Sequence, residues 1–156
     1  MYNHEPKNYL CPLCLIVNGK DNSEFYAKTA DIFYKDKYIT AFIGGKWWKN
    51  NQGNAIVIPN KHLENLYDLD DNYGHKIFDF SKKLAIALKK VYNCDGVSTR
   101  QHNEPDGNQD VWHYHLHVMP RYRDDNLYKN HDNKFWTTPE QRKPYVDKLR
   151  QYFKYD

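Results

Sequence analysis

The longest periodic pattern of apolar residues in the chain predicts one amphipathic helix. Its apolar positions recur every three or four residues, with lysines between them, at Tyr73, Ile77, Phe80, Leu84, Leu88 and Val91. This spacing places all six side chains on one helical face. Asp70 and Asp71 are candidate N-caps, and the pattern ends near residues 93–96, so we expect a helix of roughly twenty residues.

Short apolar runs on both sides of this helix predict strands. Before the helix, residues 32–34 and 38–43 flank a tight turn, and the run 55–58 stops at Pro59. After the helix, the predicted strands are 97–103 and 111–119, separated by the turn-rich segment 104–108 and closed by Pro120. The glycine- and asparagine-rich segment around Trp47 and Trp48 is expected to be a loop.

A second helix is predicted near the end of the chain. The segment Thr138-Pro139-Glu140-Gln141 resembles an N-cap followed by proline at the first helical position. Apolar residues follow at helical spacing, and Pro144, which lacks a backbone N–H, is expected to shift the regular part of this helix later. The predicted fold class is therefore α+β, a five-stranded antiparallel meander with one long helix across it and a C-terminal helix.

Length and charge limit the classes of function. The 156 residues suit one domain, 1–156, and 23 basic against 20 acidic residues are spread without a block of like charge. No apolar run reaches the ~18 residues of a membrane helix, and the start of the chain has no signal-peptide core. We therefore expect a cytoplasmic protein whose partners include neither a membrane nor a nucleic-acid polymer.

The densest chemical signal is a run of alternating histidines, His113, His115 and His117. In a strand this alternation puts the three imidazoles on one face and apolar side chains on the other. The outer two would lie about 13 Å apart, which suits one shared metal ion poorly. Neutral imidazole is a good nucleophile near pH 7, so a positioned histidine can split phosphoanhydride hydrolysis into two easier transfers.

The three cysteines fall into two groups. Cys11 and Cys14 form a Cys-x-x-Cys pair, which in a cytoplasmic chain indicates metal binding or redox chemistry. Cys94 stands alone near the end of the predicted helix, where a free cysteine usually acts as a small buried apolar residue.

Several motifs together resemble the histidine triad (HIT) nucleotide hydrolases and transferases. The segment 113–119 matches the His-φ-His-φ-His-φ-φ signature, in which φ is an apolar residue. The segment 56–62, Ile-Val-Ile-Pro-Asn-Lys-His, resembles the end of a family strand, Gln109 precedes the triad at the expected distance, and Pro120-Arg121 follows it. The resemblance runs from Cys11 to Arg121 and implies a HIT-like fold.

The resemblance also implies residue roles. It assigns the nucleophile to His115, which would take the nucleotidyl group as a phosphoramidate, and the phosphate contact that aligns it to His117. Gln109 and the loop of Asn103 would bind phosphate oxygens. Family members carry an amide eleven residues before the first triad histidine, where this chain has His102 with Asn103 beside it. Either residue can fill that role, and the sequence leaves the choice open.

Bacterial members that resemble this chain carry a structural zinc ion. Its ligands map to Cys11, Cys14, His62 and His113, which makes a closed Cys₂His₂ set and removes His113 from the catalytic group. The resemblance implies a homodimer and no organic cofactor.

Two features leave substrate recognition open. Many family members hold the ribose with an aspartate where this chain has Gly44. Trp47 and Trp48 could stack a nucleobase, or they could cover the sheet edge or a dimer interface.

The function that the resemblance implies is hydrolysis of a dinucleoside polyphosphate, of the diadenosine tetraphosphate type, at its α-phosphate. Nucleoside phosphoramidate hydrolysis is the alternative within the family. From other classes, the histidines could hold a catalytic metal in a hydrolase or oxygenase, or the chain could be a small zinc module that binds single-stranded nucleic acid.

Overall fold

The centre of the fold is a five-stranded antiparallel sheet in the spatial order β1-β2-β4-β6-β5. The computed structural model describes residues 2–130 and 132–154. The strands of this sheet are β1 Ile32–Lys35, β2 Ile39–Ile43, β4 Ala55–Pro59, β5 Gly96–Arg100 and β6 Leu116–Arg121. The predicted α+β class, with a five-stranded antiparallel sheet, a long helix and a C-terminal helix, is confirmed.

The strand order differs from the predicted meander in its last two strands. β6 lies between β4 and β5, so that His117 is opposite Ile56 on one side and Arg100 on the other. The helix α2, Asp71–Tyr92, causes the exchange because its 22 residues carry the chain past the position that β6 later fills. A helix of this length spans about 33 Å, enough to cross the sheet.

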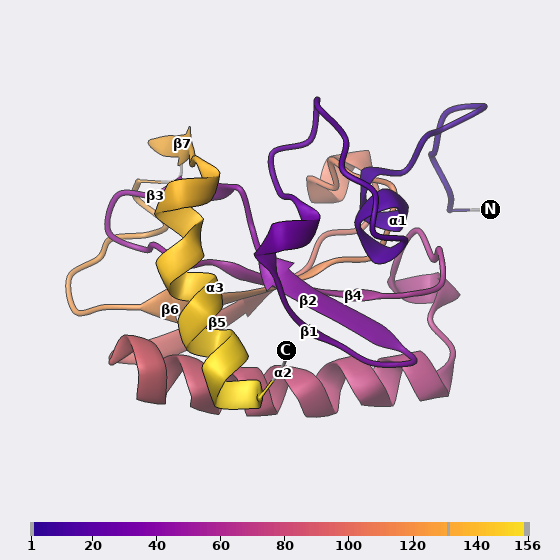
Figure 1. The fold of residues 1–156 in the computed structure, drawn as a ribbon. Coiled ribbons are helices and arrows are strands. Elements are labelled where there is room, and N and C mark those ends of the chain that lie inside the picture. Colours follow the sequence, from indigo (N-terminus) through magenta and orange to yellow (C-terminus); the bar gives the residue numbers. More distant parts are fainter. Residues whose placement is uncertain (1, 131, 155–156) are drawn as a thin grey trace.

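The long helix α2 has the limits that its sequence predicts. The Asp70 side chain accepts a hydrogen bond from the N–H of Tyr73, and Asn93 ends the helix in the left-handed conformation. Its apolar face packs on the sheet, and the helix lies along one side of it (Figure 1). None of the helices in the described residues is both long and apolar enough to cross a bilayer.

The C-terminal helix α3, Pro139–Phe153, begins directly at its predicted cap. Thr138 and Gln141 bond to each other's backbone N–H in a capping box. The expectation that Pro144 delays the regular helix is wrong, because the helix includes it. A proline here removes one backbone hydrogen bond, and burial of Val146 and Leu149 compensates for that loss.

A buried ion pair fastens α3 to the rest of the protein. Arg142 is fully buried, and its Nε donates to Asp31 Oδ1 at 2.9 Å. Its other guanidinium nitrogens donate to the carbonyl oxygens of Thr137, at 2.7 Å, and Tyr26, at 2.9 Å. The guanidinium therefore joins the start of α3 to the segment from Tyr26 to Asp31, more than a hundred positions earlier in the sequence.

The opposite face of the sheet is covered in part by α1, Pro12–Val17 (Figure 1). Its buried residues form a second cluster with Ile32, Phe42 and Ile58. Three short 3₁₀ turns complete the described elements, at Thr29–Asp31, Leu66–Asp68 and Pro105–Gly107.

A two-stranded ribbon outside the main sheet corrects the prediction of a loop around Trp47 and Trp48. Strand β3, Lys46–Trp48, pairs antiparallel with β7, Lys134–Trp136. The two strands lie almost ninety positions apart in the sequence, so no local pattern predicts their pairing. The ribbon lies beside the N-terminal end of α3 (Figure 1).

The histidine segment is only partly a strand, which corrects the predicted strand 111–119. β6 begins at Leu116, so of the three alternating histidines only His117 belongs to it. Before that point the backbone leaves the sheet: the N–H of His113 bonds to Val111 O at 2.8 Å, and that of Tyr114 bonds to Leu63 O at 2.6 Å. The three imidazoles therefore do not share one strand face.

Candidate active site

A cavity of about 470 Å³ lies on the side of the sheet opposite α2. Ile56 and His117 line it, whereas their chain neighbours Val57 and Val118 belong to the core beneath α2. Successive side chains of a strand point to opposite faces, so the alternation in β4 and β6 separates the core from the cavity. His115 lines the same cavity.

His115 presents one ring nitrogen with a free lone pair. Its Nδ1 lies 2.8 Å from the carbonyl oxygen of His113, which can only accept, so Nδ1 carries the proton. Burial lowers the pKa of His115, which keeps the ring neutral at pH 7. Its Nε2 lies 4.0 Å from Asp110 Oδ1. The arrangement is that of a nucleophile or base held in one tautomer.

His117 is held in the opposite tautomer. Its Nδ1 accepts from Asn54 Nδ2 at 3.2 Å, so the proton of the neutral ring is on Nε2. Burial lowers the pKa of His117 well below its ordinary value. The two rings are nearly perpendicular, with centroids 5.3 Å apart. His115 thus offers Nε2 as an acceptor, and His117 offers Nε2 as a donor.

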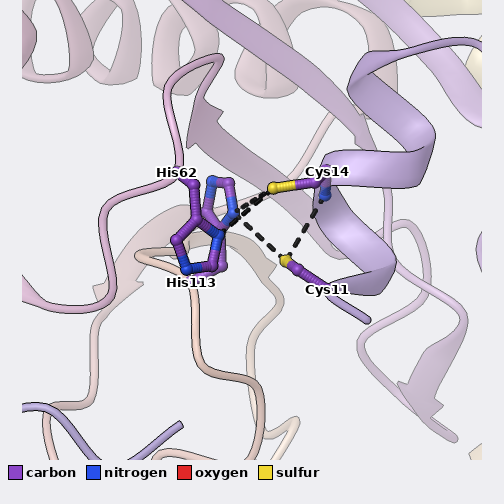
Figure 2. Close-up of side chains that lie close together, drawn as sticks. All are labelled: Cys11, Cys14, His62 and His113. Carbon is purple, nitrogen blue, oxygen red and sulfur yellow. Dashed lines mark hydrogen bonds between the residues drawn. The ribbon is translucent and has the colours of Figure 1, made fainter. Parts of the chain in front are cut away.

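A separate cluster brings together Cys11, Cys14, His62 and His113, and their ligand atoms all lie within 4.8 Å of one another (Figure 2). Cys14 Sγ is 3.2 Å from His62 Nδ1, and Cys11 Sγ is 3.3 Å from His113 Nδ1. The distances and the donor set of two thiols and two imidazoles are compatible with tetrahedral zinc.

The second ring nitrogen, Nε2, of His62 and of His113 also has a hydrogen-bond partner. His113 Nε2 lies 3.0 Å from the carbonyl oxygen of Pro59, and His62 Nε2 lies 2.9 Å from Glu5 Oε2. Both partners accept a proton, which leaves Nδ1 of each ring free for a metal. A hydrogen bond from Cys14 and the neighbouring His113 lower the pKa of Cys11 to about 3, so one thiolate is readily available.

The structure distinguishes between the two residues that could contact a phosphate in the loop after β5. His102 lines the cavity, and its Nδ1 bonds to the carbonyl oxygen of Gly107. The bond to Gly107 does not involve the other ring nitrogen, Nε2. Asn103 is turned elsewhere: its Oδ1 accepts from the N–H of Leu66 at 2.8 Å, and its amide also bonds to Gln101. Of these two residues, only His102 therefore lines the cavity.

Gln109 lines the cavity, but its side-chain amide bonds to the backbone around it. Its Nε2 donates to Glu64 O at 2.6 Å and to Val111 O at 3.2 Å, and its Oε1 accepts from the N–H of Glu104 at 2.8 Å. In this structure Gln109 holds the shape of the loop that leads to the histidines.

Asn54 fills the space that Gly44 leaves. A Cβ at Gly44 would lie 2.9 Å from Ile56 Cδ1 and 3.2 Å from Asn54 Nδ2. Asn54 Oδ1 is buried and has no hydrogen-bond partner among the described residues. Sequence reasoning missed Asn54, whose one signal is a polar residue directly before a buried strand.

The two adjacent tryptophans have different surroundings. Trp47 belongs to the core and packs edge-on against Tyr145 with ring centroids 4.9 Å apart. Trp48 is buried and lines the cavity, and the guanidinium carbon of Arg100 lies 5.3 Å from the centre of its ring. Only Trp48 thus belongs to the cavity.

Sequence reasoning also missed the charged residues of the cavity. They are Lys46, Arg100, Asp110 and Lys134. They come from four segments, so no motif groups them; the available signal was the pairing of lysine with tryptophan at 46–48 and again at 134–136.

Comparisons with known proteins place these features in context. A family model described as HIT domain matches residues 27–124. The Bacillus subtilis (strain 168) protein called Protein hit is 32% identical over 112 residues, which make up 72% of this chain and 71% of that protein.

Two further similarities extend the comparison. A bis(5'-adenosyl)-triphosphatase of Saccharomyces cerevisiae (strain YJM789) is 28% identical over 100 residues, 64% of this chain and 48% of that protein. The structure of a Zn-bound histidine triad family protein from Mycobacterium smegmatis superposes with a TM-score of 0.73 at 24% identity, covering 91% of each chain. At this sequence identity, the similarity to the mycobacterial structure shows that the two proteins share a fold.

Proposed function

The chain belongs to the HIT family, and on that premise we propose that it is a nucleotide hydrolase that cleaves its substrate at the α-phosphate through a covalent bond to His115. The substrate class we propose is a dinucleoside polyphosphate of the diadenosine tetraphosphate type. The activity in the name of the yeast relative, a bis(5'-adenosyl)-triphosphatase, supports the substrate class.

The observation that carries the proposal is the hydrogen bond from His115 Nδ1 to the His113 carbonyl. It directs the lone pair of Nε2 away from the backbone, in a ring that burial keeps neutral. A histidine without this bond would exchange tautomers and lose the lone pair for part of the time. The held tautomer is thus suited to attack on phosphorus.

The reaction then proceeds in two steps, formation of a bond between His115 and the α-phosphorus and hydrolysis of that bond. In the first, the Nε2 lone pair forms an N–P bond to the α-phosphorus, and the P–O bond to the remaining polyphosphate breaks with its electron pair on that oxygen. In the second, a water oxygen attacks the same phosphorus and one water proton passes to solvent, while the N–P bond breaks with its electron pair on Nε2, so that His115 recovers its lone pair. The polyphosphate leaving group departs as an anion, so the first step requires no proton donor.

Two histidines face the phosphate oxygens: His117 as a donor in its neutral form, and His102, whose Nδ1 proton is bonded to Gly107 O, as a donor from Nε2 only when its ring is doubly protonated. His117 carries its proton on Nε2 when Asn54 donates to Nδ1, and His102 faces the same cavity. We assign both to the α-phosphate, where fixed donors stabilise the charge that develops on its oxygens. Gln109 contributes by holding the loop, and Asn103 by fixing the position of His102.

We further propose that Cys11, Cys14, His62 and His113 hold a structural zinc ion, in a closed set that supplies no open coordination position. The ion would tie α1 to the segment before β6 and so fix the carbonyl of His113. The Zn-bound state of the mycobacterial structure is consistent with this assignment. Because His115 and His117 lie outside the cluster, a metal held jointly by the three histidines is disfavoured.

The test is turnover by the purified full chain of diadenosine polyphosphates, adenosine 5'-phosphoramidate and capped dinucleotides, with the products resolved. Hydrolysis of diadenosine tetraphosphate to AMP and ATP is expected, together with a transient mass increase of one adenylyl group on the protein. His115→Ala should lower kcat by several orders of magnitude, whereas the exposed His75→Ala should not.

Two results would contradict the proposal. Loss of less than about tenfold in kcat for His115→Ala would exclude that residue as the nucleophile. Activity that disappears with chelators and returns with a transition metal would favour a metal-dependent hydrolase instead. Light scattering on the same sample tests the homodimer that the family resemblance implies.

A further inference from the structure

One face of the β3–β7 ribbon forms part of the cavity wall. The register pairs Lys46 with Trp136 and Trp48 with Lys134. Residues opposite each other, and residues two apart on one strand, point to the same side. We call this set of four the ribbon face, and all of its members line the cavity that contains His115. The alternate residues Trp47 and Phe135 pack into the core.

The ribbon face brings positive charge into the cavity. Lys46 Nζ lies 4.4 Å from the ring centre of Trp136, and the same ring stacks in parallel on Tyr26 with centroids 3.8 Å apart. The ring therefore holds one ammonium group over the cavity mouth. Lys134 lies on the neighbouring strand β7, and burial, together with the charge of Lys134, lowers the pKa of Lys46.

Arg100 adds a third cation from the main sheet. It lies opposite His117 in the β5–β6 pairing, and its guanidinium packs over Trp48. Its Nε is buried and has no hydrogen-bond partner within the described part of the chain. Burial lowers the pKa of Arg100. A half-buried guanidinium with an unused donor favours an incoming anion.

These cations line the same cavity as the reacting atom. Asp110 Oδ1 is 4.0 Å from His115 Nε2, and the charge of the same carboxylate partly offsets the lowering of the pKa of Lys46 and of Arg100 that burial causes. Within the described residues no carboxylate forms a direct ion pair with Lys46, Lys134 or Arg100. The charge is thus placed beside the position of the α-phosphate, on the side of the ribbon.

We propose that Lys46, Lys134 and Arg100 bind the phosphates that follow the α-phosphate, so that the ribbon face selects polyphosphate substrates over substrates with a single phosphate. This inference rests on the proposed function and specifies its substrate class. Lys46 leaves the Trp136 ring when the anion arrives, and the bound phosphates later depart with the leaving group. An uncharged leaving group, such as the amine of a phosphoramidate, gains nothing from these residues.

Two measurements test the proposal, one of binding and one of turnover. Equilibrium binding of ATP and AMP reports the distal phosphates without any reaction, and wild-type protein should bind ATP at least about tenfold more tightly because charge-assisted hydrogen bonds to phosphate are strong. Lys46→Gln combined with Lys134→Gln should bring this ratio clearly closer to one, because only Arg100 of the three cations remains. Lys82→Gln combined with Lys83→Gln, which makes the same change of charge on exposed positions of α2, should retain it.

The turnover measurement compares diadenosine tetraphosphate with adenosine 5'-phosphoramidate. The Lys46/Lys134 variant should lose at least about tenfold in kcat/KM for the first substrate and a clearly smaller factor for the second. Equal losses for both substrates, or a wild-type ATP to AMP ratio near one, would overturn the inference. A retained binding ratio with no turnover of any substrate would instead overturn the proposed function, so the two failures can be distinguished.

Discussion

The side-chain amide of Asn54 lies 3.2 Å from Nδ1 of His117, and it reaches that ring from the residue directly before β4. Because Gly44 has no side chain, the Asn54 amide has room beside the position that a Gly44 Cβ would occupy. The contact decides which nitrogen of His117 carries the proton and therefore whether this histidine can donate to a substrate oxygen. It links a glycine that differs from the family pattern to the chemistry of the triad.

Substitution Asn54→Ala should therefore impair catalysis more than binding. Loss of one neutral hydrogen bond, about 1 kcal/mol, frees His117 to exchange tautomers and should lower kcat roughly fivefold to tenfold with little change in KM. Steady-state kinetics with diadenosine tetraphosphate measure both constants. Asn54→Asp should cost more, since a carboxylate attracts the proton to Nδ1. Unchanged kcat in both variants would remove Asn54 as a positioning residue.

The Cys₂His₂ cluster predicts about one zinc ion per chain in protein purified without added metal. Cys11→Ser combined with Cys14→Ser should abolish the zinc content and lower the melting temperature, because the ion stabilises only the folded state. Elemental analysis and thermal unfolding measure the two effects. Cys94→Ser, at a buried cysteine outside the cluster, should retain the metal. Protein that carries no zinc and has Cys11 joined to Cys14 would refute the assignment.

His102 and Asn103 should respond differently to truncation. His102→Ala removes a side chain that lines the cavity and should raise KM by about tenfold, the effect of one hydrogen bond to a charged group, while stability changes little. Asn103→Ala breaks the bonds to Leu66 and Gln101 and should lower the free energy of unfolding by about 1 to 2 kcal/mol. Kinetics and urea unfolding of both variants check this. The reverse pattern would assign the phosphate contact to Asn103.

Asp125 should make folding stability dependent on pH. Its carboxylate accepts from Arg121 at 2.7 Å and from Asn51 at 2.7 Å, and these contacts hold its pKa well below the ordinary value. A group with a depressed pKa in the folded state stabilises the protein at pH values above its unfolded pKa, about 4, and this contribution is lost as the pH falls further.

Asp125→Asn should accordingly destabilise the protein at pH 7 by about 2 kcal/mol or more, and the difference from wild type should shrink below about pH 4. Urea unfolding at a series of pH values measures it. Asp79→Asn on the exposed side of α2 is the matched control and should show no such dependence. A difference that stays constant down to pH 2 would show that packing, and not the charge of Asp125, is responsible.

The amino-acid sequence by itself determined the parts of this protein that depend on neighbouring residues. The cap at Asp70 and the spacing of apolar residues fixed the limits of α2, and the Thr138–Gln141 capping box fixed the start of α3. Both signals act within one or two turns, so no distant partner is required. Resemblance to the HIT family also led us to expect Cys11, Cys14, His62 and His113 together, and the structure brings these four residues into one cluster.

Only the tertiary structure decided features that join distant segments. The β3–β7 pairing, the burial of Arg142 against Asp31, and the contact of Asn54 with His117 each depend on a partner that the local sequence does not specify. Arginine on a helix ordinarily faces solvent, and it is buried here because acceptors from Tyr26, Asp31 and Thr137 surround it. A local and a distant contact together draw His113 out of the strand pattern. Its backbone bonds within the preceding turn and its ring packs against the two cysteines, so of the three alternating histidines only His115 and His117 reach the cavity.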